Sequence, residues 1–186
     1  RFADYFAAIE QFRIAISMGA PHEPTLEALE QMVEAGDYRR EAAVLLEPIY
    51  LSRLQWHKVV RVLEAQIDTE SDVVRRQDLV RRLGEVYEDY LEDFEGALSA
   101  YVRLFDDEPE SDAVIETLLR LGKASGNWRK LMELFAGYLE IHGIRSDASC
   151  RLAKETAQIA DQRENAPDLA IRWYKEILEW NPTESG

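Results

Sequence analysis

Three kinds of side chain in this sequence could take part in catalysis or metal binding: paired carboxylates, histidines and a single cysteine. Carboxylates recur at helical spacing, as at Glu85, Glu88 and Asp89. Such a pair can act as general acid and base only where burial raises the pKa of one member. No surrounding sequence predicts that burial, so we interpret these carboxylates as surface charge.

The histidines and the cysteine do not form a metal-binding or nucleophilic motif. His22, His57 and His142 lie far apart, and none belongs to H-E-x-x-H or stands beside a cysteine. Cys150 is the only cysteine, which excludes an internal disulfide, and its place on an apolar stripe predicts a small buried side chain. The glycines match neither a P-loop nor a dinucleotide fingerprint. The sequence therefore predicts a protein that is not an enzyme and has no metal or cofactor.

The overall charge narrows the possible partners. The 186 residues include 36 acidic and 22 basic side chains, a formal net charge of −14. Such a surface repels phosphate backbones and anionic lipid, so we expect neither nucleic acid nor membrane but a protein or peptide, and a basic one is favoured. Ten carboxylates and one cation lie between Glu85 and Glu110. We interpret this segment as a solvated face, with docking of a basic partner as the alternative.

The composition is that of a soluble protein, with 46% hydrophobic and 31% charged residues. No run approaches the roughly 18 apolar residues of a membrane-spanning helix, and no signal peptide is visible. We therefore expect a cytoplasmic location. The chain opens on Arg1 in what looks like a helix in progress, so we also expect a fragment of a longer protein.

Apolar residues recur with a period near 3.6, which indicates helices throughout the chain. Short polar residues precede the apolar runs, as N-caps do, at Asp37, Asp93, Ser111, Asn127 and Ser146. The predicted helices cover residues 2–18, 25–35, 38–53, 55–69, 72–91, 94–107, 111–125, 127–142, 146–162 and 166–180. Pro48 is predicted to kink or restart the third of them.

The sequence repeats itself at long range. The phrase DFEGALSAYVRLFDDEP begins at Asp93, and APDLAIRWYKEILEWNP begins at Ala166. They share an alanine, a tyrosine and a proline at equal offsets, in the pairs Ala97/Ala170, Tyr101/Tyr174 and Pro109/Pro182. Short connections make successive helices antiparallel, and a repeat of about 36 residues is typical of a helical solenoid.

The segment from Val80 to Pro109 resembles a tetratricopeptide repeat. Its first helix is compared with the family pattern W-x2-L-G-x2-Y and offers Val80, Leu83, Gly84 and Tyr87. Its second helix is compared with A-x3-F-x2-A-x4-P and offers Ala97, Tyr101, Leu104 and Pro109. The turn between the two helices is one residue longer than is usual in the family. The resemblance implies an all-α, right-handed superhelix of about five antiparallel helical hairpins. Its units would be roughly residues 1–21, 22–53, 54–70, 71–110, 111–143 and 144–186.

In this family, the first helices of successive hairpins line a concave groove that holds an extended peptide or a partner's helix. Aligned on Gly84, the resemblance implies a groove lined by Asp78, Arg81, Glu85, Glu88, Glu116, Arg120, Lys123, Arg151, Lys154 and Gln158. One subset of the family binds a C-terminal carboxylate through a clamp of cationic side chains and two asparagines. The resemblance disfavours such a clamp here, because Glu85 and Thr117 stand at the two asparagine positions and Glu155 stands at one of the cation positions. Two interpretations of these charged side chains remain open. They are either solvated surface charge or a bipolar peptide site, with an acidic and a basic end.

The last predicted helix carries Trp173 and Trp180, seven residues apart, where the stronger repeat has Ala100 and Asp107. Large aromatic side chains at these positions predict a covering surface: a following repeat, a second copy or a partner. The sequence thus favours a non-catalytic protein–protein interaction scaffold that binds through its groove. The alternatives are a structural spacer that self-associates through the terminal helix and a regulatory domain of a larger enzyme.

Overall fold

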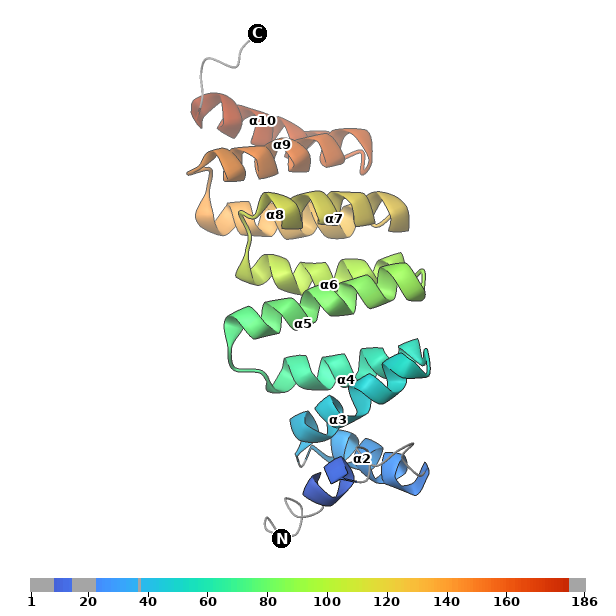
Figure 1. Ribbon diagram of the computed structural model, residues 1–186. Helices are drawn as coiled ribbons and strands as arrows, with labels where there is room; N and C mark the ends of the chain where they lie inside the picture. Colours follow the sequence, from blue (N-terminus) through green and yellow to red (C-terminus); the bar gives the residue numbers. More distant parts are fainter. Residues whose placement is uncertain (1–8, 15–22, 37, 181–186) are drawn as a thin grey trace. The chain divides into compact units, whose positions relative to one another are not determined.

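The computed structural model describes residues 9–14, 23–36 and 38–180, and their regular structure is helical throughout (Figure 1). After a helical segment at residues 9–14, the elements are α2 (Glu23–Ala35), α3 (Arg39–Ser52), α4 (Trp56–Thr69), α5 (Val73–Glu85), the π-helical turn η1 (Val86–Tyr90), α6 (Phe94–Asp107), α7 (Asp112–Ser125), α8 (Trp128–His142), α9 (Asp147–Gln162) and α10 (Pro167–Trp180). The prediction of an all-α chain of antiparallel hairpins is confirmed. Most of the predicted helix at residues 2–18 lies outside the described residues.

The chain forms two compact units, Arg1–Glu92 and Asp93–Gly186. Within each unit, successive helices pack against one another in a roughly antiparallel way (Figure 1). The boundary falls inside the segment 71–110, for which the sequence predicted a single repeat. The division into repeat units therefore stays a prediction.

Two of the predicted N-caps make the expected hydrogen bond. The Asp93 side chain accepts from the backbone N–H of Gly96 at 2.8 Å, which satisfies one of the free N–H groups at the start of α6. Ser146 forms a capping box with Ser149 at the start of α9. Ser111 also stands at an N-cap, but its side chain makes no capping hydrogen bond.

The other residues that were expected to mark the starts and ends of helices differ in what they do. Asn127 precedes α8 without a side-chain capping bond, and Asp37 lies outside the described residues. Gly126 ends α7 in the left-handed region, with φ 74°, a conformation in which glycine alone has no steric penalty. The first and last residues of the helices were thus easier to predict than the capping hydrogen bonds at those ends.

Helix α3 runs through Pro48 as one element, so the predicted restart of this helix is wrong. Proline cannot donate to the carbonyl of Val44, one turn earlier. The side chain of Val44 is 49% exposed, which leaves this side of the helix open to water. Leu46 and Tyr50, before and after the proline, are buried, and we infer that their packing holds the two turns in line.

The turn between the two helices of the 71–110 segment is one residue longer than is usual in the family, and the π-helical turn η1 accommodates this residue. Its last turn closes with a hydrogen bond from Leu91 N to Val86 O at 3.2 Å, the i to i+5 pattern of a π-helix. Tyr90 stacks on Trp56 with 3.8 Å between ring centroids. The wider turn thus accommodates one more residue without ending the helix early.

Gly122 of α7 packs closely against α8. A Cβ atom at this position would overlap Cδ1 of Leu131 and lie 3.2 Å from its Cγ. Leu131 stands at the position where the tetratricopeptide pattern has a small residue. The structure shows that a glycine on the facing helix provides the space for it.

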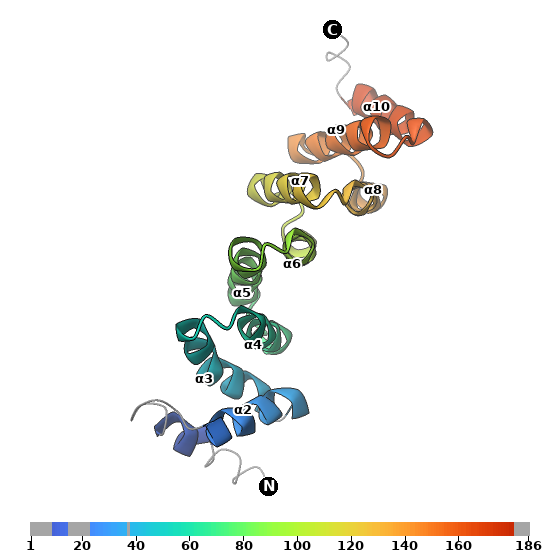
Figure 2. The ribbon, with the colours of Figure 1, turned by 90° about the vertical axis from the view of Figure 1, so that its right-hand side faces the viewer.

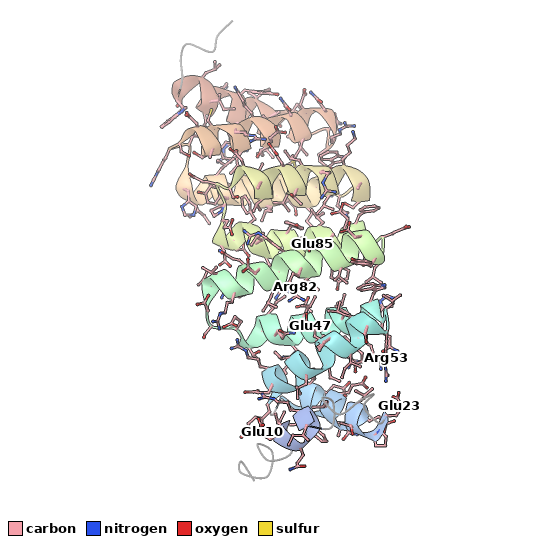
Figure 3. All side chains as sticks on the ribbon, viewed as in Figure 1. Glu10, Glu23, Glu47, Arg53, Arg82 and Glu85 are labelled. Carbon is pink, nitrogen blue, oxygen red and sulfur yellow. The ribbon has the colours of Figure 1, made fainter. Side chains whose placement is uncertain are left out.

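A buried polar network connects three helices of the first unit. Glu47 of α3 is 9% exposed, and its two carboxylate oxygens accept from different partners. Gln66 Nε2 of α4 donates to Glu47 Oε2 at 2.6 Å, and the guanidinium of Arg82 of α5 donates to Glu47 Oε1. Figure 3 labels Glu47 and Arg82 on their helices. The network pairs the charge that folding buries.

Replacing Glu47 with glutamine is expected to lower the free energy of unfolding by about 1–2 kcal/mol. The amide offers one acceptor oxygen, so either Gln66 or Arg82 must face an NH2 group in place of an oxygen. The free energy of unfolding is measured by urea titration with circular dichroism. Glu34→Gln is the matched control, because the Glu34–Arg61 pair is exposed, at 63% and 55%, and its loss changes stability by less than about 1 kcal/mol. Equal effects of the two substitutions would contradict the network.

Candidate functional site

The helices of the second unit form two layers. Figure 2 shows α7 and α9 on one side of this unit and α6, α8 and α10 on the other. In the first layer, α7, α9 and the start of α8 surround a pocket of about 400 Å³. We call it the cationic pocket. Its polar lining consists of Arg120, Lys123, Glu155, Gln158, Gln162 and Arg163, and its apolar lining of Leu119, Trp128 and Ile159.

The amphipathic pattern of two helices places the polar side chains in the pocket. Arg120 and Lys123 are three residues apart on α7 and exposed, while Leu118 and Leu121 of the same helix are buried. On α9, Gln158 and Gln162 are four residues apart and exposed. Residues at these spacings share one face of a helix, so each helix turns a polar pair toward the same hollow.

The charge of the pocket is opposite to that of the whole chain. Three cations, Arg120, Lys123 and Arg163, line it with one carboxylate, Glu155, whereas the chain has a net charge of −14. The guanidinium of Arg163 lies 5.2 Å from the ring centroid of Trp128, within range of a cation–π interaction. The pocket thus combines positive charge, side-chain amides and an aromatic surface.

The structure brings together some of the predicted groove residues of the second unit. Arg120, Lys123 and Gln158 line the cationic pocket. Glu116 and Arg151 pair with each other at 3.1 Å, outside the pocket lining.

Arg151 is engaged by two carboxylates of α7. Besides Glu116, it binds Asp112 at 2.6 Å, and the hydrogen bond to Glu116 is the main cause that raises the pKa of Arg151. Its charge is therefore neutralised within the chain. Lys154 lies half-buried on α9 and does not line the pocket.

The other predicted groove residues belong to the first unit. Asp78 and Arg81 of α5 form a pair within their own helix, 3.6 Å apart. Glu85 is the last residue of α5, and Glu88 lies in the π-helical turn.

Sequence reasoning missed several residues of the pocket. The 3.6-residue period places Trp128 on the apolar stripe of α8, yet this side chain is half-buried and lines the pocket. Gln162 and Arg163 stand at the end of α9 and carried no motif. The available signal was the i, i+4 spacing of Gln158 and Gln162 on the exposed side of a helix whose buried side is mainly apolar.

The prediction that Trp173 needs a covering surface is wrong. Its side chain is fully buried, with 0% exposure, because it shares the inner face of α10 with Ala170 and Ile177 at the i, i+3, i+7 spacing of a buried helix face. Trp173 therefore cannot bind a partner. Trp180 is 44% exposed, and its role in binding stays a prediction.

Helix α10 instead exposes a different set of apolar side chains. Ile171, Tyr174 and Leu178 are 51%, 39% and 45% exposed. Their spacing of three and four residues places them in one row. We call this row the α10 apolar stripe.

The chemically reactive side chains remain scattered. His57 and His142 are exposed and belong to different units, and His22 lies outside the described residues. Cys150 is half-buried, whereas its position on an apolar stripe predicted a buried side chain. Among the described residues, no cluster of three or more His, Cys, Asp or Glu side chains could hold a metal ion. In the same residues, no helix combines the length and the apolar character that crossing a membrane requires.

The architecture defines the class of the protein as an all-α array of antiparallel hairpins. No family model matches the sequence, and no curated protein matches it. Structures of MamA align with the chain over nearly its full length. One, a crystal structure of MamA protein, is 13% identical, covers 99% of this chain and 93% of that chain, and has a TM-score of 0.41. Another, MamA AMB-1 in a P212121 crystal, is 15% identical, covers 96% and 90%, and also has a TM-score of 0.41.

Proposed function

We propose that the protein is a non-catalytic, tetratricopeptide-like interaction scaffold whose cationic pocket binds an extended, acidic peptide segment of a partner protein. The observation that carries the proposal is the reversal of charge. Arg120, Lys123 and Arg163 meet at one hollow of a chain with a net charge of −14. The net charge alone predicted a basic partner, but binding depends on the local charge that a ligand meets.

The lining offers each kind of contact that a peptide requires. Arginine and lysine form charge-assisted hydrogen bonds with carboxylates. The amides of Gln158 and Gln162 can both donate and accept, which suits the N–H and C=O groups of an extended main chain. Trp128 and Ile159 supply apolar area for one side chain.

The proposal is tested by photo-cross-linking from the pocket. A benzoylphenylalanine at Gln158, in cells of the source organism, is expected to capture a partner segment that contains Asp or Glu, identified by mass spectrometry. Arg120→Glu together with Lys123→Glu is expected to reduce the yield about tenfold, because like charges now face the ligand.

Lys175→Glu is the control, since it reverses an exposed charge on α10, away from the pocket lining, and we expect an unchanged yield. A capture that survives the double reversal, or a captured segment without acidic residues, would disprove the acidic-peptide assignment.

The α10 apolar stripe favours a second candidate function, an arm that self-associates through its terminal helix. Exposed apolar side chains in a continuous row are typical of interaction surfaces. Sedimentation velocity of the chain and of an Ile171→Glu/Leu178→Glu variant tests it. A dimer that the variant loses would support self-association, whereas a monomer in both cases would reject it.

A further inference from the structure

The second layer of the same unit contains a hollow of its own. Helices α6 and α8, which belong to the layer opposite to α7 and α9 (Figure 2), border a groove of about 560 Å³. Its apolar surface includes Phe105, Leu134, Gly137, Tyr138 and Ile141, and its charged edge includes Asp106 and Glu133. We call it the α6–α8 groove.

The groove includes open space above Gly137, where α8 has no side chain. A Cβ atom placed there would meet no heavy atom of the described residues within 4 Å. Ile141, one turn further on, is 77% exposed. A glycine in the middle of a helix weakens it, and an exposed isoleucine gains nothing from burial. Both features suit a groove that another apolar side chain fills.

The wall beside this space is held rigidly. The ring of Tyr138 packs edge-on against Phe105, with centroids 5.7 Å apart, and stacks on His142 at 4.5 Å. Its hydroxyl donates to Glu110 at 3.2 Å. Burial and the hydrogen bond to Glu110 raise the pKa of Tyr138. The phenol, which is protonated at neutral pH even at its ordinary pKa, therefore donates this hydrogen bond there.

The edge of the groove is negative. Asp106 and Glu133 are exposed, and no lysine or arginine is found among the described residues that line the groove. The cations near this edge include Arg129, which Glu164 binds at 3.0 Å, Lys130, which donates to Ser99 of α6 at 2.8 Å, and Arg145, whose charge acts on Tyr138. Arg103 also stands on α6, one turn before Asp106. A ligand that places cations beside the two carboxylates would be attracted, and an anionic one repelled.

We propose that the α6–α8 groove docks a basic segment of a partner protein. An aliphatic or aromatic side chain of the segment lies over Gly137, against Tyr138 and Ile141, and flanking lysine or arginine side chains pair with Asp106 and Glu133. This surface differs in place and in charge from the cationic pocket. One unit would then bind two segments of opposite charge, on opposite layers.

The proposal is tested with a phage-displayed library of random dodecapeptides, selected on the wild-type chain and counter-selected on Gly137→Leu. Leucine fills the open space and is a better helix former than glycine, so this variant keeps its melting temperature while the groove is blocked. We expect peptides in which lysine or arginine flanks an apolar residue. Their Kd should rise about tenfold or more on Gly137→Leu and on Asp106→Lys/Glu133→Lys, and should rise with added salt.

The control variants separate this groove from the cationic pocket. Gly137→Ala leaves most of the space open and should bind the selected peptides nearly as wild type does. Arg120→Glu/Lys123→Glu alters only the cationic pocket, so it should leave their Kd unchanged whether or not the acidic-peptide proposal holds. Recovery of no peptide that distinguishes wild type from Gly137→Leu, or of peptides without basic residues, overturns the proposal. So does a wild-type dimer that Gly137→Leu dissociates, which would assign the groove to a second copy.

Discussion

Trp173→Ala is expected to lower the free energy of unfolding by about 3–5 kcal/mol, the range for removing a large aromatic side chain from a core. Trp173 is among the largest fully buried side chains and has 0% exposure. Truncation at Cβ leaves a cavity that the surrounding α9 and α10 side chains fill only in part. Urea unfolding followed by circular dichroism measures the effect.

Two further variants show that burial is the cause. The indole Nε1 of Trp173 is buried, and no described residue accepts a hydrogen bond from it. Trp173→Phe therefore loses none of the described hydrogen bonds and should cost much less than alanine, on the order of 1 kcal/mol. Trp180, 44% exposed, should tolerate alanine with a change below about 1 kcal/mol. Equal losses for Trp173→Ala and Trp180→Ala would mean that Trp173 is not in the core.

Gly122→Val is expected to cost about 3 kcal/mol, at the upper end of the range for overpacking. Its Cβ atom would overlap Cδ1 of Leu131, and Leu131 is fully buried. Either the leucine takes another rotamer within the core or the two helices move apart, and both disturb the packing. The midpoint of urea unfolding gives the magnitude.

Gly137→Ala is the matched control in the neighbouring helix. Nothing lies within 4 Å of a Cβ atom at Gly137, and alanine in a helix is more stable than glycine by about 0.5–1 kcal/mol. We therefore expect opposite signs from two glycine substitutions in one hairpin. Stabilisation by both would refute the close approach of α7 and α8.

Local signals explain why so much of the fold was predictable. The 3.6-residue period and the polar residues at helix starts locate α6 to α10 within about a residue of their observed bounds, because both depend on neighbours along the chain. Pro48 shows the limit of such signals. It stops an isolated helix, but α3 continues through it since packing on both sides outweighs the lost hydrogen bond.

The candidate site was predictable only in part, because it depends on which helices meet. The family register located Arg120, Lys123 and Gln158, which line one pocket. The same register could not show that Arg151 is taken up by Asp112 and Glu116.

The buried face of the last helix was available from the sequence, because Ala170, Trp173 and Ile177 have the i, i+3, i+7 spacing of such a face. The open space above Gly137 was not, because it depends on which side chains surround that residue in the fold.

The most direct test of the central claim is a backbone NMR titration of the labelled chain with the partner peptide captured from Gln158. The account predicts chemical-shift changes concentrated at Arg120, Lys123 and Trp128 and along α9, and their disappearance in Arg120→Glu/Lys123→Glu. Changes centred on the α10 apolar stripe or on α5, with the cationic pocket unaffected, would contradict it.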